Sequence, residues 1–327
     1  MAALHHPDVA FVLSGGASLG AVQAGMLRAL YERGIRPDVV VGTSAGALNG
    51  AFIASRPQTT ATAEELADVW RGLRRGRVFP LEPFTGLLGF LGGRDHLVPA
   101  SGLRRLIARY AHECAIEELA IPLHVVAVDV VSGEELLLSD GPLREAVLAS
   151  AAIPGVFAPV AWQDRLLMDG GVANNTPISH AVALGARRIY VLPTGHACRL
   201  ERRPRGALEM VLQALSLLTQ RRLIEDIERH RDAARLIVLP PPCPLSVTPF
   251  DFSRADELIE RALHDARDFF DGGGEEQPPI RMSMHAHPPS VVEAPEDVGG
   301  PSVEERVRAG ANLLDEQLID AGVGERL

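Results

Sequence analysis

The residues best suited to chemistry in this sequence begin with a serine set between two glycines. Gly42 and Gly46 flank Ser44 in a G-x-S-x-G pattern, after an apolar run at 39–41 and before a helix-forming run at 45–53. Between a strand and a helix this pattern is typical of a nucleophile elbow, a sharp turn that exposes the serine hydroxyl. The alternative is a glycine-rich turn in which Ser44 only caps the helix.

A serine hydroxyl is a poor nucleophile until a base takes its proton. Asp169 is the candidate base, because it follows an apolar run, precedes Gly170 and Gly171, and lies 125 residues after Ser44. The carboxyl ends of parallel strands converge on one edge of a sheet, so this separation is no obstacle. The alternative is a turn aspartate that bonds its own backbone, as Asp-Gly sequences often do.

Hydrolysis of an ester also needs donors for the developing oxyanion. The loop that follows the first apolar run contains Gly15, Gly16, Ala17 and Gly20, and its backbone N–H groups are the candidates. A phosphate-binding loop is excluded, because Ala and Val follow Gly20 where Lys and Ser or Thr are required. Ala17 breaks the dinucleotide pattern G-x-G-x-x-G. A tight turn without catalytic function remains the alternative.

Elements of an α/β sheet must position these groups. The pattern predicts strand 9–13, helix 19–33, strand 38–43 and then the helix after Ser44, a βα repeat that favours a mostly parallel sheet with right-handed crossovers. Further predicted strands are 123–131, 134–138, 165–168, 188–192 and 236–239. Further predicted helices are 63–73, 103–111, 143–151, 177–184, 207–231 and 254–270.

The glycine loop, the serine elbow and the Asp-Gly-Gly turn, in this order, resemble the patatin-like phospholipase family, as do the connecting phrases at 149–157 and 169–177. The resemblance covers residues 8–195. It implies a three-layer α/β/α fold with a mostly parallel central sheet, in which Ser44 is the nucleophile and Asp169 its direct partner. It also implies an oxyanion loop at Gly15, Gly16 and Ala17, acyl-ester lipids as substrates and no cofactor or metal.

Two departures from the family pattern keep other functions open. Leu19 stands where the family usually has arginine, and Ala17 replaces a glycine. A lipid-binding or regulatory protein with the same fold but without catalysis is therefore one alternative. An esterase of the α/β-hydrolase type with a Ser-Asp-His triad is another, because His180 and His196 both follow Asp169.

Charge and composition narrow the function classes. The chain of 327 residues has a formal net charge of −10 and no lysine, which excludes a Walker lysine, a Schiff base and a Ser-Lys dyad. Residues 1–272 carry −3 and residues 273–327 carry −7, so we expect neither part to offer the basic surface that nucleic acid or an anionic membrane surface requires. We expect a catalytic domain at 8–272 and a flexible acidic tail at 273–327, with a helix at 303–319.

Two further predictions concern membranes and cysteines. The N-terminus lacks an arginine before its apolar run, so we expect no signal peptide and a cytoplasmic protein, peripheral at the membrane through the apolar stretch 78–93. That stretch could equally be a cap packed on the core. The cysteines Cys114, Cys198 and Cys243 match no metal-binding spacing, so we expect reduced, buried thiols.

Overall fold

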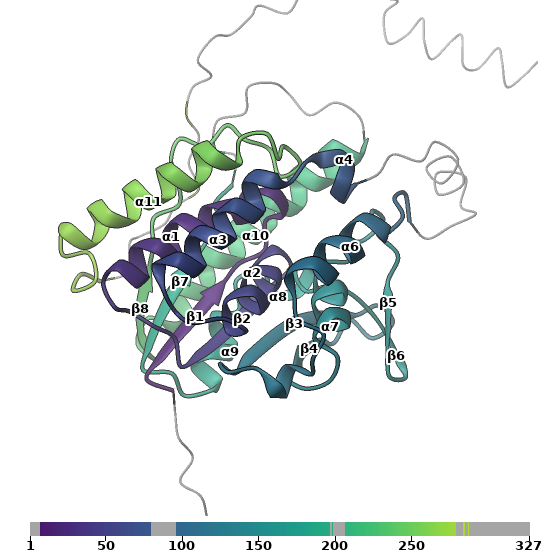
Figure 1. Ribbon diagram of the computed structural model, residues 1–327, viewed down its shortest axis with the longest axis horizontal. Coiled ribbons are helices and arrows are strands. Elements are labelled where there is room, and N and C mark those ends of the chain that lie inside the picture. Colours follow the sequence, from purple (N-terminus) through teal and green to yellow (C-terminus); the bar gives the residue numbers. More distant parts are fainter. Residues whose placement is uncertain are drawn as a thin grey trace, which may run out of the picture. The chain divides into compact units, whose positions relative to one another are not determined.

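The computed structural model describes residues 7–79, 96–196, 198, 207–278, 284 and 287. Its centre is an eight-stranded sheet with the order β5-β6-β3-β2-β1-β7-β8, and β4 adds to β3 (Figure 1). Strands β1 (Val9–Leu13), β2 (Val39–Thr43), β3 (Leu123–Asp129), β7 (Arg188–Leu192) and β8 (Arg235–Val238) run parallel. Strands β4 (Glu135–Leu138), β5 (Val160–Trp162) and β6 (Arg165–Asp169) pair antiparallel. The mostly parallel sheet predicted from the sequence is confirmed.

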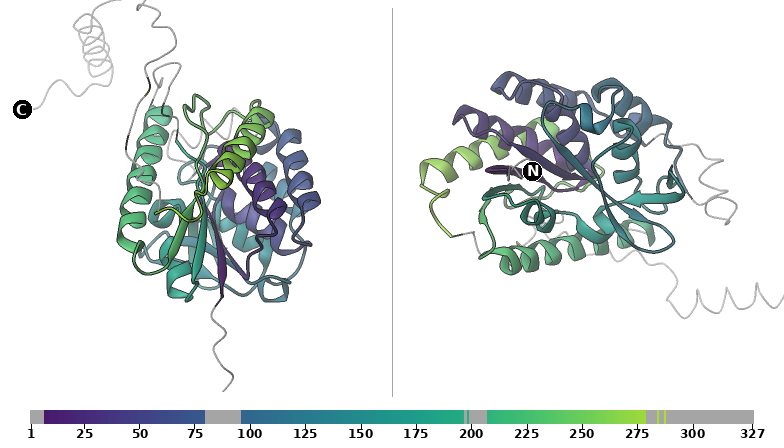
Figure 2. Two further views of the ribbon diagram at one scale, coloured as in Figure 1. Left: turned by 90° about the vertical axis from the view of Figure 1, so that its left-hand side faces the viewer. Right: turned by 90° about the horizontal axis from the view of Figure 1, so that it is seen from below.

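Helices cover both faces of the sheet because alternate side chains of β1 enter two separate cores. Phe11 and Leu13 belong to the larger core, and Ala10 and Val12 to the smaller one. The larger core is packed by α1 (Val22–Glu32), α2 (Ala45–Ala54), α3 (Thr60–Gly72), α6 (Ser101–Tyr110), α7 (Leu143–Ser150) and α11 (Ala255–Asp271). The smaller core is packed by α9 (Ile178–Ala183) and α10 (Ala207–His230). Figure 2 shows α10 on the opposite side of the sheet from α1 and α3, which confirms the three-layer arrangement.

The register of β3 explains how distant residues meet. β2 pairs with the first part of β3, where Thr43 lies opposite Val126. β6 pairs with the last part, where Asp169 lies opposite Ala127. Because Ser44 follows Thr43, the end of β2 and the end of β6 face consecutive residues of β3. The sheet therefore brings Ser44 and Asp169 to the same place.

The remaining described elements are short. A 3-10 turn (Ala17–Ala21) precedes α1, α4 (Arg75–Val78) follows α3, a 3-10 turn (Ile116–Glu118) precedes β3, and α8 (Gly171–Asn174) follows β6. The predicted helix 19–33 begins later than expected because its first part forms the 3-10 turn. The sequence analysis missed β5, a three-residue strand at the end of the sheet.

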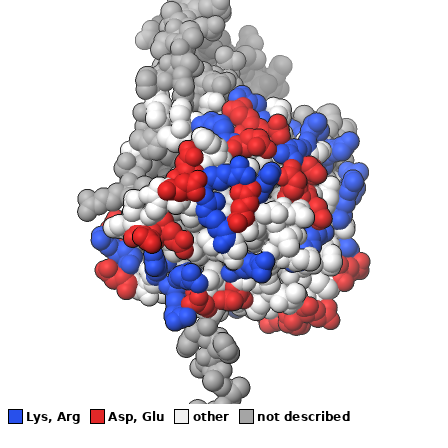
Figure 3. Space-filling view, turned by 60° about the vertical axis from the view of Figure 1, so that its left-hand side comes forward, with Lys and Arg blue, Asp and Glu red and all other residues white. Residues whose placement is uncertain are grey.

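Ion pairs tie the outer helices together on the face that Figure 3 shows, where acidic and basic side chains alternate. Arg71 of α3 bonds Glu64, Asp68, Asp256 and Glu260, the last two from α11. Exposed pairs of this kind each contribute only about 0–1 kcal/mol. They join α3 to α11 without carrying the stability of the fold, which rests on the two apolar cores.

Two predictions concern residues outside the described part of the chain. They are the helix predicted at 303–319 and most of the apolar stretch 78–93. Contacts with the sheet continue past residue 272, since the Tyr190 hydroxyl donates to the Glu275 carboxylate and Arg235 donates to the Glu275 carbonyl oxygen at 2.9 Å. No helix among the described residues is both long and apolar enough to span a membrane.

Candidate active site

Ser44 occupies a strained turn between β2 and α2. Its φ of 54° and ψ of −120° are unusual for a residue with a Cβ, and its side chain makes no cap hydrogen bond to α2. The turn is tight because α2 starts directly against the end of β1. A Cβ on Gly46 would lie 2.1 Å from the Leu13 carbonyl oxygen, so only glycine fits there. Because the Ser44 side chain makes no cap hydrogen bond to α2, the alternative that it only caps the helix is wrong.

Asp169 accepts a hydrogen bond from the Ser44 hydroxyl. Ser44 Oγ donates to Asp169 Oδ2 at 2.7 Å, and both side chains are buried. The other oxygen, Oδ1, accepts the Gly171 N–H at 2.7 Å. Asp169 is thus both a turn aspartate that bonds its own backbone and the partner of Ser44. Gly171 fixes the carboxylate in the orientation that reaches the serine.

The environment of Asp169 favours a proton acceptor poised near neutrality. Burial of the carboxyl group raises its pKa to about 6, against the opposing effect of the hydrogen bonds from Gly171 and Ser44. Burial raises the pKa because a low-dielectric site disfavours the charged form. At neutral pH the carboxylate form still predominates, and its basicity is higher than that of an exposed aspartate. General bases work best when their pKa lies close to the operating pH.

Ser150 fixes the backbone of the elbow. The Ser44 N–H donates to Ser150 Oγ at 2.8 Å, and the Ser150 hydroxyl donates to the Val126 carbonyl oxygen at 2.6 Å. One buried side chain at the end of α7 therefore links the turn to β3. The sequence analysis did not identify Ser150, although it lies in the connecting phrase 149–157.

The glycine loop presents two backbone donors beside this pair. The Gly15 N–H is used structurally, since it donates to the Asn175 carbonyl oxygen at 3.0 Å. Within the described part of the chain, the Gly16 and Ala17 N–H groups form no hydrogen bond. Ala17 has a φ of 49°, a conformation that glycine adopts more easily. The loop is close to Ser44, because a Cβ on Gly15 would lie 3.1 Å from Ser44 Cβ.

Neighbouring segments hold the glycine loop from two sides. Asn175 Nδ2 donates to the Gly15 carbonyl oxygen at 3.2 Å, and Thr194 Oγ1 donates to the same oxygen at 2.7 Å. A Cβ on Gly16 would lie 2.3 Å from Thr194 Oγ1, so the glycine loop is in contact with the segment that carries Thr194. Ser18 N–H donates to the Pro249 carbonyl oxygen at 2.9 Å. Asn175 and Thr194 had no signal of their own in the sequence beyond their place at strand or turn ends.

A network of buried polar side chains bonds the backbone where the glycine loop begins. Gln23 Nε2 donates to the carbonyl oxygens of Ser14 and Leu192, both at 2.9 Å. Asn49 Nδ2 donates to Gln23 Oε1 at 2.7 Å, and Trp70 Nε1 donates to Asn49 Oδ1 at 2.9 Å. Gln23 and Asn49 are completely buried. Satisfied networks of this kind fix one arrangement of the backbone, because any unpaired member would be costly.

Neither of the two histidines considered for a triad lies between Ser44 and Asp169. His180 Nε2 lies 2.5 Å from Glu135 Oε1, so its ring is paired with another carboxylate. His196 is buried after β7. Both oxygens of Asp169 already accept hydrogen bonds, from Ser44 and Gly171. The aspartate therefore contacts the serine directly, whereas in a triad a histidine stands between them.

The other glycines of the predicted site all lie in the elements that surround the pair. Gly42 is in β2, the Gly20 carbonyl oxygen accepts from Asn49 Nδ2 at 3.0 Å, and Gly170 precedes α8. The prediction of buried thiols is correct for Cys198 and wrong for Cys243, which is exposed, and for Cys114, which is partly exposed. Burial of a single thiol depends on tertiary packing that spacing along the sequence does not report.

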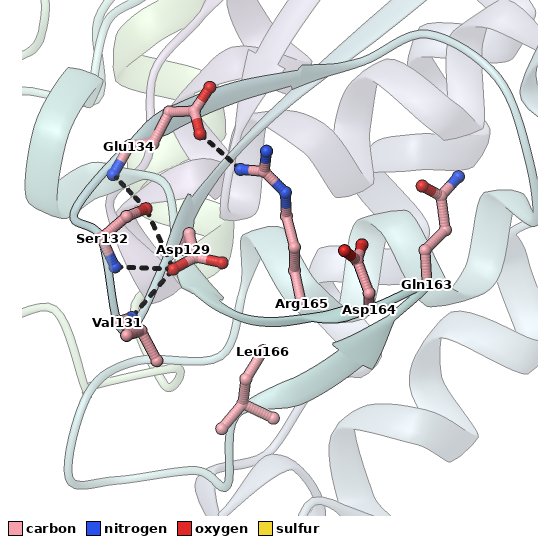
Figure 4. A pocket seen from close by; sticks show the side chains of 8 residues that line it. All are labelled: Asp129, Val131, Ser132, Glu134, Gln163, Asp164, Arg165 and Leu166. Atoms are coloured by element: carbon pink, nitrogen blue, oxygen red, sulfur yellow. Dashed lines mark hydrogen bonds and ion pairs between the residues drawn. The ribbon is translucent and has the colours of Figure 1, made fainter.

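A separate hollow of about 570 Å³ lies between the β3–β4 and β5–β6 hairpins (Figure 4). Four of its polar residues, Asp129, Ser132, Glu134 and Arg165, bond other residues of the lining. Arg165 points to Glu134, and Asp129 Oδ1 accepts the N–H groups of Val131 and Ser132 at 2.9 and 2.7 Å. Neither Ser44 nor Asp169 lines it. The hollow therefore belongs to the hairpin turns and not to the serine site.

Comparison with known proteins agrees with the fold. The sequence matches the family "Patatin-like phospholipase" over residues 11–182, more than half of the chain. The chain belongs to the patatin-like phospholipase family, a family of lipid acyl hydrolases. The resemblance to this family that the sequence motifs indicated is confirmed.

Among its relatives, patatin-like phospholipase domain-containing protein 7 of Mus musculus is 30% identical over 57% of this chain. Patatin-like phospholipase domain-containing protein 6 of Homo sapiens is 31% identical over 57%. An uncharacterized NTE family protein of Mycobacterium tuberculosis is 32% identical over 55%. The matches span only 14%, 13% and 47% of these relatives' own lengths.

Two solved structures also match. VipD from Legionella pneumophila aligns with a TM-score of 0.44 and 17% identity, over 80% of this chain and 66% of that chain. ExoU in its complex with SpcU from Pseudomonas aeruginosa aligns with a TM-score of 0.36 and 18% identity, over 81% of this chain and 52% of that chain.

Proposed function

We propose that this protein is a serine acyl hydrolase that cleaves carboxylic esters of lipids through a Ser44–Asp169 dyad. The observation that carries the proposal is the hydrogen bond from Ser44 Oγ to Asp169 Oδ2 at 2.7 Å, at a turn that holds the serine in a strained conformation. Family membership supports a lipid ester as substrate.

In the proposed mechanism, Asp169 takes the proton of Ser44 while Oγ attacks the ester carbonyl carbon. The Gly16 and Ala17 N–H groups stabilise the oxyanion. Gly15 has a supporting role, since its own N–H already bonds Asn175. The tetrahedral intermediate expels the alcohol, which leaves with the proton from Asp169, and an acyl-serine ester remains. Water, activated by Asp169, then attacks this ester and releases the fatty acid.

The departures from the family pattern are accommodated in the fold. Leu19 is 1% exposed and packs in the larger core, so its side chain makes no polar contact with a substrate. Ala17 keeps its N–H in the loop despite the strain of its positive φ. These facts favour catalysis over the lipid-binding alternative, because Ser44 bonds Asp169 and the N–H groups of Gly16 and Ala17 form no hydrogen bond among the described residues.

A fluorophosphonate probe, which reacts with activated serines, tests the proposal. The wild type should be labelled, Ser44→Ala should not, and Asp169→Asn should be labelled far more slowly. Ser55→Ala is the matched control, because this partly buried serine bonds the end of α2 and the neighbouring Arg56 and makes no contact with Ser44 or Asp169. Absence of labelling together with absence of hydrolysis of phosphatidylcholine, lysophosphatidylcholine and short acyl esters would refute the enzyme proposal and favour the lipid-binding alternative.

The histidine-dependent mechanism is tested in the same assay. His180→Ala and His196→Ala should each leave turnover within a few-fold of the wild type. If either change abolished turnover while Asp169→Asn retained it, the dyad would be replaced by a triad.

We also propose that the surface formed by α4 and α6 faces the anionic surface of a lipid bilayer. This basic surface consists of six exposed arginines, Arg74, Arg75, Arg77, Arg104, Arg105 and Arg109. Among described residues 73–79 and 96–111 no aspartate or glutamate occurs. The two segments flank residues 80–95, which contain most of the apolar stretch predicted to contact the membrane. Net charge alone gave no sign of this local concentration.

Sedimentation with vesicles tests this surface. Each arginine near an anionic bilayer contributes about 1 kcal/mol, so Arg105→Ala with Arg109→Ala should weaken binding by roughly 30-fold. Arg36→Ala with Arg187→Ala changes two exposed arginines that precede the amino ends of β2 and β7, outside α4 and α6, and should leave binding unchanged. Equal binding by both double variants would refute the proposed surface.

A further inference from the structure

Two cysteines and a histidine, far apart in the sequence, meet beside the carboxyl ends of β7 and β8. Cys198 follows β7, Cys243 follows β8 and His287 lies beyond α11. Cys198 Sγ lies 4.0 Å from Cys243 Sγ, and Cys243 Sγ lies 3.1 Å from His287 Nε2. All three potential ligand atoms lie within 4.8 Å of one another.

These distances are close to those around a tetrahedral zinc ion. With Zn–S bonds of about 2.3 Å and a Zn–N bond of about 2.0–2.1 Å, tetrahedral angles place two sulfurs about 3.8 Å apart and a sulfur and a nitrogen about 3.6 Å apart. The sulfurs are well beyond the bonded distance of a disulfide, about 2.05 Å. Two thiolates and one imidazole form a donor set that zinc prefers over magnesium or calcium.

The surroundings orient the candidate ligands. The Leu245 N–H donates to Cys198 Sγ at 3.2 Å, a contact that fixes the position of the sulfur. The His287 N–H donates to the Cys198 carbonyl oxygen at 3.0 Å, which holds the histidine backbone beside the first cysteine. Cys198 is buried while Cys243 is exposed, so an ion has a path from solvent.

From this arrangement we infer that Cys198, Cys243 and His287 bind one zinc ion, with a fourth coordination position left for water or another donor. Binding would release the protons of the two thiols. The ion would connect the segment after β7, which carries Thr194, to the segment after β8, which leads to Pro249. Both segments bond the glycine loop, so the site would support that loop without contacting the reacting atoms.

Zinc titration of the full chain tests the inference. Protein kept reduced and stripped with a chelator should take up one zinc per chain in competition with a chromophoric chelator. Cobalt(II) should give the thiolate-to-cobalt absorption and visible bands of a tetrahedral site. Cys198→Ser, Cys243→Ser and His287→Ala should each weaken zinc binding by more than about 100-fold, because even outer-shell changes cost 10–100-fold.

Two matched variants serve as controls. Cys114→Ser and His264→Ala change a cysteine and a histidine elsewhere in the chain and should bind zinc as the wild type does. Circular dichroism shows whether each variant folds, and His287→Ala keeps the test valid if a cysteine variant does not. Absence of stoichiometric zinc, binding unaffected by the three substitutions, or a Cys198–Cys243 disulfide in air with no zinc affinity after reduction would overturn the inference.

Discussion

The activity of the proposed dyad should fall with acidification because Asp169 must be ionised to accept the serine proton. Burial raises the pKa of Asp169 to about 6. With that pKa, the ionised fraction is roughly nine-tenths at pH 7 and roughly one-tenth at pH 5. We therefore expect kcat/KM to fall about tenfold between pH 7 and pH 5, with half of the maximal value near pH 6.

The stability of the fold should change in the opposite direction. The folded-state pKa of Asp169 lies above its unfolded value, so protonation stabilises the native state. This contribution is fully present below about pH 4 and is lost as the pH rises through about 6. Protonation of Asp169 therefore does not unfold the protein, so a loss of activity at pH 5 needs a cause other than unfolding by this group. Circular dichroism at each pH measures whether the protein remains folded.

A water-soluble short-chain ester, assayed from pH 4.5 to 8.5 at constant ionic strength, gives the profile. Asp265→Asn is the matched control, because burial also raises the pKa of that carboxyl group in α11. Its profile should equal that of the wild type. A wild-type profile that is flat from pH 5 to 8, or an inflection that moves in Asp265→Asn, would refute the assignment of Asp169 as the base.

Three further changes test how the site is held. Ser150→Ala leaves the buried Ser44 N–H without its acceptor and should lower the free energy of unfolding by about 1–3 kcal/mol in urea titrations, whereas Ser55→Ala should cost less. Gly46→Ala places a Cβ 2.1 Å from a backbone oxygen and should cost at least about 2–3 kcal/mol, while Gly72→Ala meets nothing within 4 Å and should not destabilise. Asn175→Ala removes one of the two side-chain hydrogen bonds to the Gly15 carbonyl oxygen and should lower kcat on the order of tenfold with little change in KM; an unchanged kcat would show that the loop needs no such support.

The sequence predicted the two residues that form the pair and every described strand except β5, because each carries a local signal, and the family resemblance implied the three layers. Ser44 is flanked by glycines that its tight turn requires, and Asp169 precedes an Asp-Gly turn that the structure contains. Strand periodicity and the βα repeat predict that both residues lie at the carboxyl ends of parallel strands, but this is wrong for Asp169. Its strand β6 runs antiparallel to β3, so Asp169 meets Ser44 because β2 and β6 end opposite consecutive residues of β3.

The supporting residues could not be predicted because their roles depend on contacts between distant segments. Ser150 bonds a residue 106 positions away, and Thr194 bonds one 179 positions away. The assembly of Cys198, Cys243 and His287 has the same origin, since no spacing along the chain reports it. The basic surface on α4 and α6 was hidden because acidic residues elsewhere offset it in the net charge.

The bonds that hold the glycine loop also set when the enzyme could first work during synthesis. Gly15 depends on Asn175 and Thr194, and Ser18 depends on Pro249, so the loop near the N-terminus is completed by residues made much later. A ribosome-bound chain that ends before Pro249 contains both Ser44 and Asp169 but lacks the last of these supports. Labelling of Ser44 in nascent chains of increasing length would therefore report the completion of the site, and the proposed hydrolysis would begin only after Pro249 has been made.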